Sequence, residues 1–305
     1  MNILVTGATG FIGSHLVRRL LSLKHNIYIS TRPNSDLSRI SGLSSQFSKI
    51  DIDSSLNGIE KTFQESTIDG VIHLATYYRK EDSTEEMENM NKTNIDFPLQ
   101  LLSFAKKYKS TFFINTGTCF EYASSSESIN EDSPIQPFNY YASTKLKFEK
   151  NLIDSIQDSS FKALTLKLFF PYGEKDNNKL VKLLIDSLIQ KKEFHVTKGE
   201  QNLSYTYVSD IIEAYILALS HIKMTESKYD VFNIGSSAIK VSDIFDTLEE
   251  ISNKKGLIMR DKEYAKNEIM NMHTESEKAK KILGWKQKFS LTEGLQQTYN
   301  YYLQH

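Results

Sequence analysis

Three evenly spaced glycines near the N-terminus constrain the fold of this chain more than any other feature. Gly7, Gly10 and Gly13 separate an apolar run at residues 3–6 from a segment with helical periodicity at residues 12–23. In such a turn the first glycine allows a tight bend, the second lets the backbone approach a pyrophosphate, and the third lets the helix pack closely on the strand. The N–H groups at the helix N-terminus favour an anion. The pattern predicts a phosphate-binding strand–turn–helix, and an ordinary strand-to-helix turn is the alternative.

Strand-like and helical segments alternate along the first 170 residues. After the first strand, apolar runs occur at residues 26–30, 47–51, 70–74, 111–115 and 163–169. Helical patterns lie between them at residues 12–23, 56–65, 87–107 and 140–155. Most of the strand-like runs are apolar throughout, as in strands that are covered on both faces. The alternation predicts an α/β fold with a doubly wound parallel sheet of the Rossmann type.

The second half of the chain follows a looser pattern. Helices are expected at residues 180–190, 209–221, 241–252, 275–283 and 291–302, with one strand at residues 229–233. We expect residues 1–169 and 204–240 to form a dinucleotide-binding domain. Residues 170–203 and 241–305 are expected to form a smaller C-terminal substrate-binding lobe.

Composition argues against several classes of protein. The 305 residues include a single cysteine, Cys119, so neither an internal disulfide nor a multi-cysteine metal site can form. The seven histidines show no metal-ligand spacing, and no bound metal is expected. The net charge of -1 argues against nucleic-acid binding. No apolar run approaches the roughly 20 residues of a membrane span, and a cytoplasmic protein without membrane contact is expected.

The end of the second predicted strand bears on which dinucleotide is bound. An NAD site normally has an acidic residue about 20 residues beyond the glycines, where it binds the ribose 2′-hydroxyl. Here Ser30, Thr31 and Arg32 occupy that region, and the next acid is Asp36. A guanidinium with neighbouring hydroxyls suits a 2′-phosphate. NADP(H) is therefore favoured, while NAD(H) stays open as the alternative, with Arg32 merely solvated.

A tyrosine and a lysine four residues apart form the candidate catalytic pair. Tyr141 and Lys145 would lie on one face of the helix predicted at residues 140–155. A nearby ammonium stabilises phenolate, so the tyrosine can exchange a proton with a substrate oxygen near neutral pH. The lysine can also hold the nicotinamide ribose. The spacing alone is common in a chain with 16 tyrosines, but its position after the glycine turn and several strand–helix units makes it informative.

These motifs resemble the extended branch of the short-chain dehydrogenase/reductase superfamily, and in particular its NAD-dependent epimerase/dehydratase family. The further matching motifs are Val71-Ile-His-Leu-Ala-Thr76, Phe169-Phe-Pro-Tyr-Gly173, Tyr205-Thr-Tyr-Val-Ser-Asp210, Phe232-Asn-Ile-Gly235 and Leu283-Gly-Trp285. Together they span nearly the whole chain. The resemblance implies an enzyme that acts on a nucleoside-diphosphate sugar, held between the cofactor domain and the C-terminal lobe.

The resemblance also assigns cofactor-binding residues. Asp51 and Ile52 correspond to the pair that contacts the adenine, and Leu74, Ala75 and Thr76 to the segment beneath the phosphates and riboses. The full predicted set is Gly7, Thr9, Gly10, Phe11, Ile12, Arg32, Asp51, Ile52, Leu74, Ala75, Thr76, Asn94, Tyr141 and Lys145.

The residues after the fifth predicted strand bear on the reaction. In the family, a Ser or Thr at the position of Thr118 binds the substrate oxygen that the tyrosine protonates. Thr118 therefore joins Tyr141 and Lys145 in the predicted catalytic set. In the 4,6-dehydratases of the family, two acids that carry out the elimination follow this residue. Cys119 and Phe120 stand there instead, which argues against a dehydratase.

Residues 34–39 and 74–78 most resemble 4-ketoreductases of the CDP-abequose synthase type, which implies a role in O-antigen biosynthesis. Family members often have Asn at the position of Phe170 and a diphosphate-binding Arg at that of Leu203. Lys179, Lys182 and Arg79 are the candidates to replace that Arg, and a solvated helix face is the alternative for Lys179 and Lys182. The predicted substrate-binding residues are Tyr78, Arg79, Thr118, Cys119, Phe120, Phe170 and Lys179.

The sequence thus predicts a nucleotide-sugar oxidoreductase that reduces a 4-keto (6-deoxy)hexose with NAD(P)H. A nucleotide-sugar 4-epimerase with tightly bound NAD would use the same residues and is the alternative. A redox-sensing regulator without catalysis is a third interpretation, against which the Tyr–Lys pair argues. The resemblance also implies a homodimer formed through residues 94–107 and 141–155.

Overall fold

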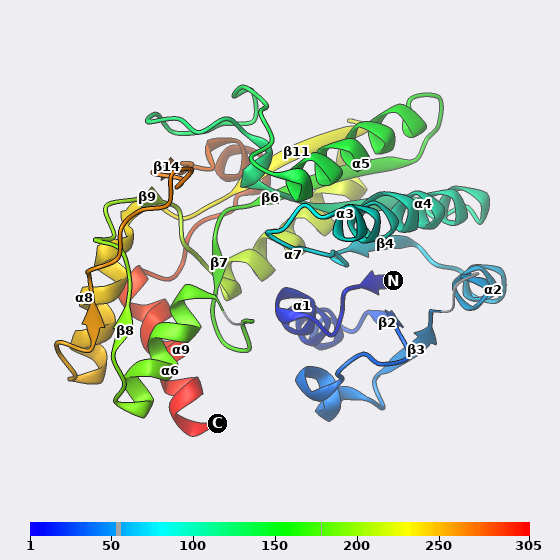
Figure 1. Cartoon of the computed structure of the whole chain (residues 1–305). Helices are drawn as coiled ribbons and strands as arrows, with labels where there is room; N and C mark the ends of the chain where they lie inside the picture. Colours follow the sequence, from blue (N-terminus) through cyan, green and yellow to red (C-terminus); the bar gives the residue numbers. More distant parts are fainter. Residues whose placement is uncertain (53–55, 178) are drawn as a thin grey trace. The chain divides into compact units, whose positions relative to one another are not determined.

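The computed structural model describes residues 1–52, 56–177 and 179–305 (Figure 1). The chain forms two compact units. Unit 1 consists of Met1–Ala123, Pro134–Lys167 and Ala214–Phe232, and unit 2 of Ser124–Ser133, Leu168–Glu213 and Asn233–His305. This division differs from the expected one at residues 124–133, 168–169, 204–213 and 233–240, which belong to unit 2.

Long-range pairing explains why residues 124–133 and 204–213 join unit 2. The Ile129 N–H donates to the His273 carbonyl oxygen (2.8 Å), and Ser124 Oγ donates to the Asn271 carbonyl oxygen (2.9 Å). Residues 204–213 include β10 (Thr206–Tyr207), which pairs in parallel with β7 (Pro171–Tyr172). Contacts between residues so far apart in the sequence leave no local pattern from which to predict them.

The seven-stranded sheet lies mainly in unit 1 and has the order β11-β6-β5-β4-β1-β2-β3. β1 pairs in parallel with β2 and β4, and the pairs β2–β3 and β4–β5 are also parallel. Because the order runs outward in both directions from β1, the predicted doubly wound α/β fold of the Rossmann type is confirmed. The strands are β1 (Asn2–Thr6), β2 (Asn26–Thr31), β3 (Phe47–Asp51), β4 (Gly70–His73), β5 (Phe112–Thr118), β6 (Lys162–Leu168) and β11 (Tyr229–Ile234).

Apolar side chains of the helices and the sheet form the core of unit 1. α1 (Phe11–Ser22) packs on β1 and β2. α2 (Asn57–Glu65), α4 (Phe97–Lys107) and α5 (Tyr140–Ile156) share one buried cluster with the sheet, and α4 and α5 lie side by side (Figure 1). α7 (Val208–Met224) begins in unit 2 and ends in unit 1. The cluster includes Phe63, Leu101, Phe113 and Phe148.

The helix predicted at residues 87–107 is interrupted in the structure. α3 (Thr84–Asn91) is followed by the π-helical segment η2 (Lys92–Asp96) and then by α4. Pro98 stands in the first turn of α4, where the missing N–H costs little. Asn94 lies within the π-helical segment and is fully buried. Such segments are frequent at functional sites, and this one contains a predicted cofactor-binding residue.

Unit 2 combines short strand pairs with α6 (Leu180–Gln190), α8 (Val241–Ser252) and α9 (Leu291–Gln304), which pack on one another. Trp285 is fully buried, and its indole N–H donates to the Asp210 carbonyl oxygen (2.8 Å). The helix predicted at residues 275–283 ends in the π-helical segment η4 (Ala279–Leu283). The strand pairs are formed by β8 (Phe194–His195) with β13 (Ile258–Met259), and by β9 (Asn202–Leu203) with β12 (Ile239–Lys240) and β14 (Asn271–Met272).

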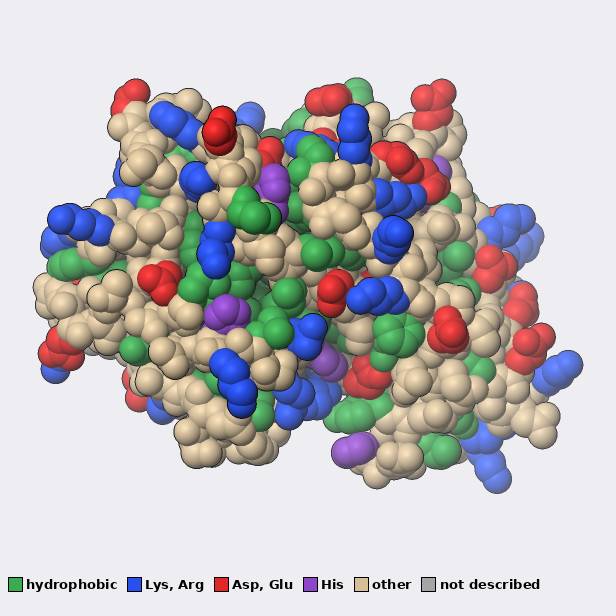
Figure 2. Space-filling view, turned by 180° about the vertical axis from the view of Figure 1, so that it is seen from behind, with side chains coloured by type: hydrophobic (Ala, Val, Ile, Leu, Met, Phe, Trp, Pro, Cys, Tyr) green, Lys and Arg blue, Asp and Glu red, His purple; other side chains and the backbone are tan. Residues whose placement is uncertain are grey.

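The surface view shows acidic and basic side chains interspersed on the face drawn in Figure 2. Among the described residues, no helix is both long and apolar enough to cross a membrane. In the same part of the chain, no three His, Cys, Asp or Glu side chains gather in a way that could hold a metal ion.

Candidate active site

The glycine turn between β1 and α1 has the geometry that a pyrophosphate requires. Gly7 has a φ of +68°, and a Cβ there would lie 2.6 Å from the Ala75 backbone nitrogen. A Cβ on Gly13 would lie 2.1 Å from the Gly7 carbonyl oxygen. Gly10 precedes α1, and in the described structure the first turn of α1 has neither an acidic residue nor a side-chain cap. Its first N–H groups are therefore left for an anion, and the turn fits a dinucleotide.

The ends of β2 and β3 carry the groups that were predicted to select the dinucleotide. Thr31 Oγ1 donates to Asp51 Oδ1 (3.2 Å). Lys49 Nζ lies 2.8 Å from the same oxygen, and this hydrogen bond lowers the pKa of Asp51. Arg32 is exposed, and its backbone N–H donates to Ser35 Oγ (3.0 Å). The Arg32 guanidinium is thus exposed directly beyond β2, and the hydroxyl of the preceding Thr31 binds the Asp51 carboxylate.

A buried histidine joins the ends of β1 and β4. Thr6 Oγ1 hydrogen-bonds with His73 Nδ1 (2.8 Å) and accepts the Ala75 N–H (3.2 Å). Burial lowers the pKa of His73 well below its usual value, so the ring is neutral. These bonds order the segment after β4 that approaches Gly7. They were not predicted from the sequence, although a polar Thr and His at the ends of apolar strands indicate such a contact.

Asn94 fixes the backbone that follows β4. Its Oδ1 accepts the Tyr77 N–H (2.8 Å), and its Nδ2 donates to the Tyr77 carbonyl oxygen (2.9 Å) and to Thr144 Oγ1 (3.0 Å). Because a backbone N–H only donates and a carbonyl only accepts, Tyr77 determines the orientation of the amide. The Thr76 hydroxyl therefore donates to Asn94 Oδ1 (3.1 Å). Asn94 ties η2, residues 76–77 and α5 together.

α5 presents the predicted catalytic pair one helical turn apart. Asn139 caps the helix by accepting the Ala142 N–H at its Oδ1 (2.9 Å). Lys145 is 2% exposed, and burial lowers its pKa to about 8. Burial raises the pKa of Tyr141, whose hydroxyl hydrogen-bonds with Thr76. Near neutral pH Lys145 is therefore mostly protonated and Tyr141 is a phenol, the form that can give a proton to a carbonyl oxygen.

The two predicted substrate-binding residues after Tyr77 lie in different surroundings. The rings of Tyr78 and Tyr141 meet edge to face, with their centroids 4.9 Å apart. Arg79 lies over the Tyr77 ring, 4.7 Å from its centroid, and 3.8 Å from the Glu86 carboxylate. The structure thus brings Tyr78 to the catalytic phenol, whereas Arg79 makes its contacts within its own loop and with α3.

Thr118 ends β5 and caps the short 3-10 turn η3 (Cys119–Glu121). Thr118 Oγ1 accepts the Phe120 N–H (3.3 Å), and the Thr118 N–H donates to Glu121 Oε1 (2.9 Å). Cys119 is buried, and Phe120 packs against Phe138 with ring centroids 6.0 Å apart. Cys119 and Glu121 both act electrostatically on Tyr141, so η3 lies near the phenol. Glu121 was not predicted as a site residue, although its Thr-x-x-Glu spacing from Thr118 is that of a capping box.

The remaining predicted substrate-binding residues belong to unit 2. Phe170 has a φ of +31° and stacks on Tyr205 with ring centroids 5.5 Å apart. Lys179 is exposed and precedes α6. Lys182 forms an ion pair with Asp186 of the same helix. Leu203 is buried in β9, so this position supplies no guanidinium for a diphosphate.

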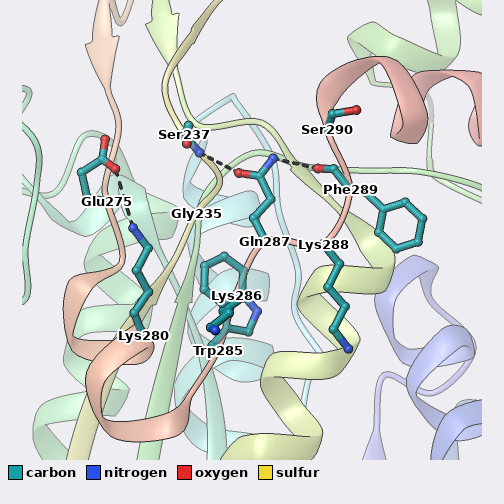
Figure 3. Close-up of a pocket in the computed structure, with 10 residues that line it drawn as sticks. All are labelled: Gly235, Ser237, Glu275, Lys280, Trp285, Lys286, Gln287, Lys288, Phe289 and Ser290. Carbon is teal, nitrogen blue, oxygen red and sulfur yellow. Dashed lines mark hydrogen bonds and ion pairs between the residues drawn. The ribbon is translucent and has the colours of Figure 1, made fainter.

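Unit 2 also contains a cavity of about 370 Å³ (Figure 3). In it, the Ser237 N–H donates to Gln287 Oε1 (3.1 Å), and Lys280 lies 3.8 Å from the Glu275 carboxylate. The described residues that line it include none of the predicted site residues. They are Gly235, Ser237, Glu275, Lys280, Trp285, Lys286, Gln287, Lys288, Phe289 and Ser290.

The fold and the glycine turn define a dinucleotide-binding enzyme of the Rossmann type. A model of the NAD dependent epimerase/dehydratase family matches residues 3–235, and the chain belongs to this family. Its members are NAD-dependent enzymes that act on nucleotide sugars. CDP-abequose synthase from Salmonella typhimurium is 29% identical over 312 residues, which cover 97% of this chain and 96% of that protein.

Solved structures agree with this assignment. A UDP-glucuronic acid 4-epimerase mutant from Bacillus cereus, in complex with UDP-4-deoxy-4-fluoro-glucuronic acid and NAD, matches with a TM-score of 0.89 and 27% identity, over 100% of this chain and 99% of that chain. UDP-glucose 4-epimerase from Thermotoga maritima, in a structure with UDP-glucose, matches with a TM-score of 0.88 and 27% identity. The match covers 99% of this chain and 98% of that chain. The family resemblance inferred from the motifs is confirmed.

Proposed function

We propose that this enzyme reduces the 4-keto group of a nucleoside-diphosphate (6-deoxy)hexose. The observation that carries the proposal is the Tyr141–Lys145 pair, with its buried lysine, next to η3, in which Cys119 and Phe120 supply no acid for an elimination. The similarity to CDP-abequose synthase over nearly the whole chain supports the same class of substrate. Reduction at C4 needs only a hydride, which the cofactor would supply, and one proton donor, for which Tyr141 is the candidate.

The residues of unit 1 have separate roles in the proposed reaction. When bound, NAD(P)H would supply the hydride to C4. Tyr141 transfers its phenolic proton to the C4 oxygen, which Thr118 Oγ1 orients, and the resulting phenolate later takes a proton from solvent. The Lys145 ammonium lowers the energy of that phenolate and can hold the nicotinamide ribose. The product is a C4 alcohol that contains one new C–H and one new O–H bond.

We extend the proposal to the binding site of the nucleotide sugar and to the oligomeric state. We assign the nucleotide sugar to unit 2, with Phe170 and the exposed Lys179 as candidate contacts, because Leu203 supplies no cation. A homodimer through α4 and α5 is a further prediction, which light scattering coupled to gel filtration would test.

Arg32 is proposed to favour NADPH over NADH. Replacement by alanine, Arg32→Ala, should weaken NADPH binding at least about tenfold because a charge-assisted contact to the 2′-phosphate is lost. NADH binding should change less than about twofold. Fluorescence titration of both cofactors measures the ratio, with Arg18→Ala as a control because Arg18 is exposed on α1. Equal losses for the two cofactors would show that Arg32 does not read the phosphate.

A 4-epimerase is the second candidate, and the epimerase structures at 27% identity favour it. An epimerase keeps one dinucleotide bound and oxidises and then reduces C4 without net consumption. Mass spectrometry of small molecules released from the purified protein separates the two functions. A reductase should release little cofactor and should require added NADPH. Stoichiometric release of NAD, together with interconversion of the sugars without added NADPH, would establish the epimerase.

A further inference from the structure

Four charged side chains are buried together within unit 1. Lys167 Nζ of β6 lies 2.9 Å from Glu121 Oε2 and 3.5 Å from Glu149 Oε1. The side chains of Glu121, Lys167 and Glu149 are 0%, 3% and 9% exposed. Lys145, the fourth, is one helical turn before Glu149 on α5. Charges buried this deeply cost several kcal/mol each unless they are compensated, so their arrangement needs an explanation.

Glu121 is held more firmly than an ordinary ion-pair partner. Its Oε1 accepts the Thr118 N–H (2.9 Å), while its Oε2 faces Lys167. Gly117 leaves room for the pair, because a Cβ there would lie 2.9 Å from Lys167 Cγ and 3.1 Å from Glu121 Oε1. The carboxylate is thus fixed from two sides, and it directly adjoins the backbone of the residue predicted to orient the substrate oxygen.

The surroundings shift the pKa values of Glu149 and Lys167 in this cluster. Burial, and then the charge of Glu121, raise the pKa of Glu149. Burial lowers the pKa of Lys167, but the two carboxylates outweigh this effect and raise it overall. Glu149 also hydrogen-bonds with Tyr229 of β11. Glu149 therefore gains a proton more readily than an ordinary glutamate does.

Lys145 is the group on which this charge acts. Among the described residues, Lys145 makes no ion pair, and its charged neighbours are Glu121 and Glu149. His73 of β4 also faces it but is neutral because of burial. The two carboxylates oppose the loss of the Lys145 proton that burial favours.

We propose that Glu121 is a positioning residue that acts through Lys145, and that its fixed, buried carboxylate holds the ammonium of the catalytic pair in its charged form. The inference rests on the proposed role of Tyr141 and Lys145. It adds a residue outside that pair, and it explains why a second lysine, Lys167, is buried with the carboxylates: Lys167 and the Thr118 N–H hold the Glu121 carboxylate in place.

The titration of Lys145 tests this inference without any substrate. In protein labelled with ¹⁵N at the lysine side chains, the Lys145 signal is assigned by its absence from a Lys145→Met variant, and its midpoint is followed by NMR. The wild-type midpoint should lie at about 8. Glu121→Gln removes the negative charge at nearly constant size and should lower the midpoint by about 1 pH unit. Glu121→Asp keeps the charge and should leave the midpoint near that of wild type.

Two further variants separate this effect from a loss of stability. Asp210→Asn removes another buried carboxylate that accepts backbone N–H groups, those of Lys288 (3.0 Å) and Phe289 (3.3 Å). It should lower the melting temperature without moving the Lys145 midpoint. If Glu121→Gln does not fold, Glu121→Met removes the same charge with a side chain of similar length and should give the same downward shift. An unchanged Lys145 midpoint in Glu121→Gln, or in Glu121→Met where that variant is used, would overturn the inference.

The same proteins distinguish a failure of this inference from a failure of the proposed function. If the reductase assignment holds, the pH profile of kcat in Glu121→Gln should move to lower pH together with the NMR midpoint, because the charge acts on Lys145 and Tyr141 alike. A shifted midpoint in a protein that reduces no 4-keto sugar would refute the function and support the electrostatic role. Normal turnover together with an unchanged NMR midpoint and an unchanged pH profile would support the function and refute the electrostatic role.

Discussion

The Tyr141→Phe protein should turn over roughly a thousandfold more slowly than the wild type while binding its dinucleotide with nearly unchanged affinity. The substitution removes only the hydroxyl, so the ring contact with Tyr78 remains and the proton donor is lost. Steady-state kinetics and a separate cofactor titration measure the two effects. The expected loss appears in kcat, because the proton is transferred only during the reaction.

Tyr140→Phe is the matched control for this experiment. Tyr140 is the preceding residue on α5, and its hydroxyl donates to Asn91 Oδ1 (3.0 Å) rather than facing the catalytic pair. Its replacement should leave kcat within about twofold of wild type. If Tyr141→Phe retained full turnover, tyrosine could not be the proton donor, and the proposed mechanism would fail whatever the substrate.

Gly13→Ala is expected to have the second large effect. A Cβ at this position would lie 2.1 Å from the Gly7 carbonyl oxygen, which is backbone and cannot move aside without displacing the phosphate-binding turn. The free energy of unfolding should fall by about 2 kcal/mol, and the affinity for the dinucleotide should fall at least about tenfold. Denaturant unfolding and cofactor titration measure these quantities.

Gly42→Ala provides the comparison for Gly13→Ala. Gly42 lies in the 3-10 turn η1 (Ser38–Leu43), and nothing stands within 4 Å of a Cβ built there. Its replacement should change the free energy of unfolding by less than about 0.5 kcal/mol and leave cofactor binding intact. A Gly13→Ala protein that matched this control in both measurements would mean that the turn is looser than its geometry indicates.

The local elements of the fold were predictable because they depend on neighbours in the sequence. β3 and α6 have the predicted bounds, and the glycine turn lies where the pattern of Gly7, Gly10 and Gly13 requires it. The parallel sheet follows from strands that are apolar on both faces and are linked by helices. The interruption between α3 and α4 was not predicted, because apolar periodicity continues through the π-helical segment.

The parts of the site that depend on distant residues were not predictable. Asn94 was assigned to the cofactor by resemblance, but its four hydrogen bonds to residues 76, 77 and 144 appear only once the chain is folded. Glu121 and Lys167 are 46 residues apart in the sequence, as their numbers show, and nothing local indicates that both are buried. The placement of residues 124–133 in unit 2 likewise depends on residues 271–275.

The transfer of deuterium from the cofactor tests the proposed reaction most directly. The purified enzyme is incubated with NADPH that is fully deuterated at C4 of the nicotinamide and with a nucleoside-diphosphate 4-keto-6-deoxyhexose, and the product is analysed by mass spectrometry and NMR. We predict one deuterium at C4 of the sugar and one NADP⁺ formed per product. Conversion of a nucleotide sugar without net oxidation of NADPH and without deuterium at C4 would contradict the reductase and identify the enzyme as an epimerase.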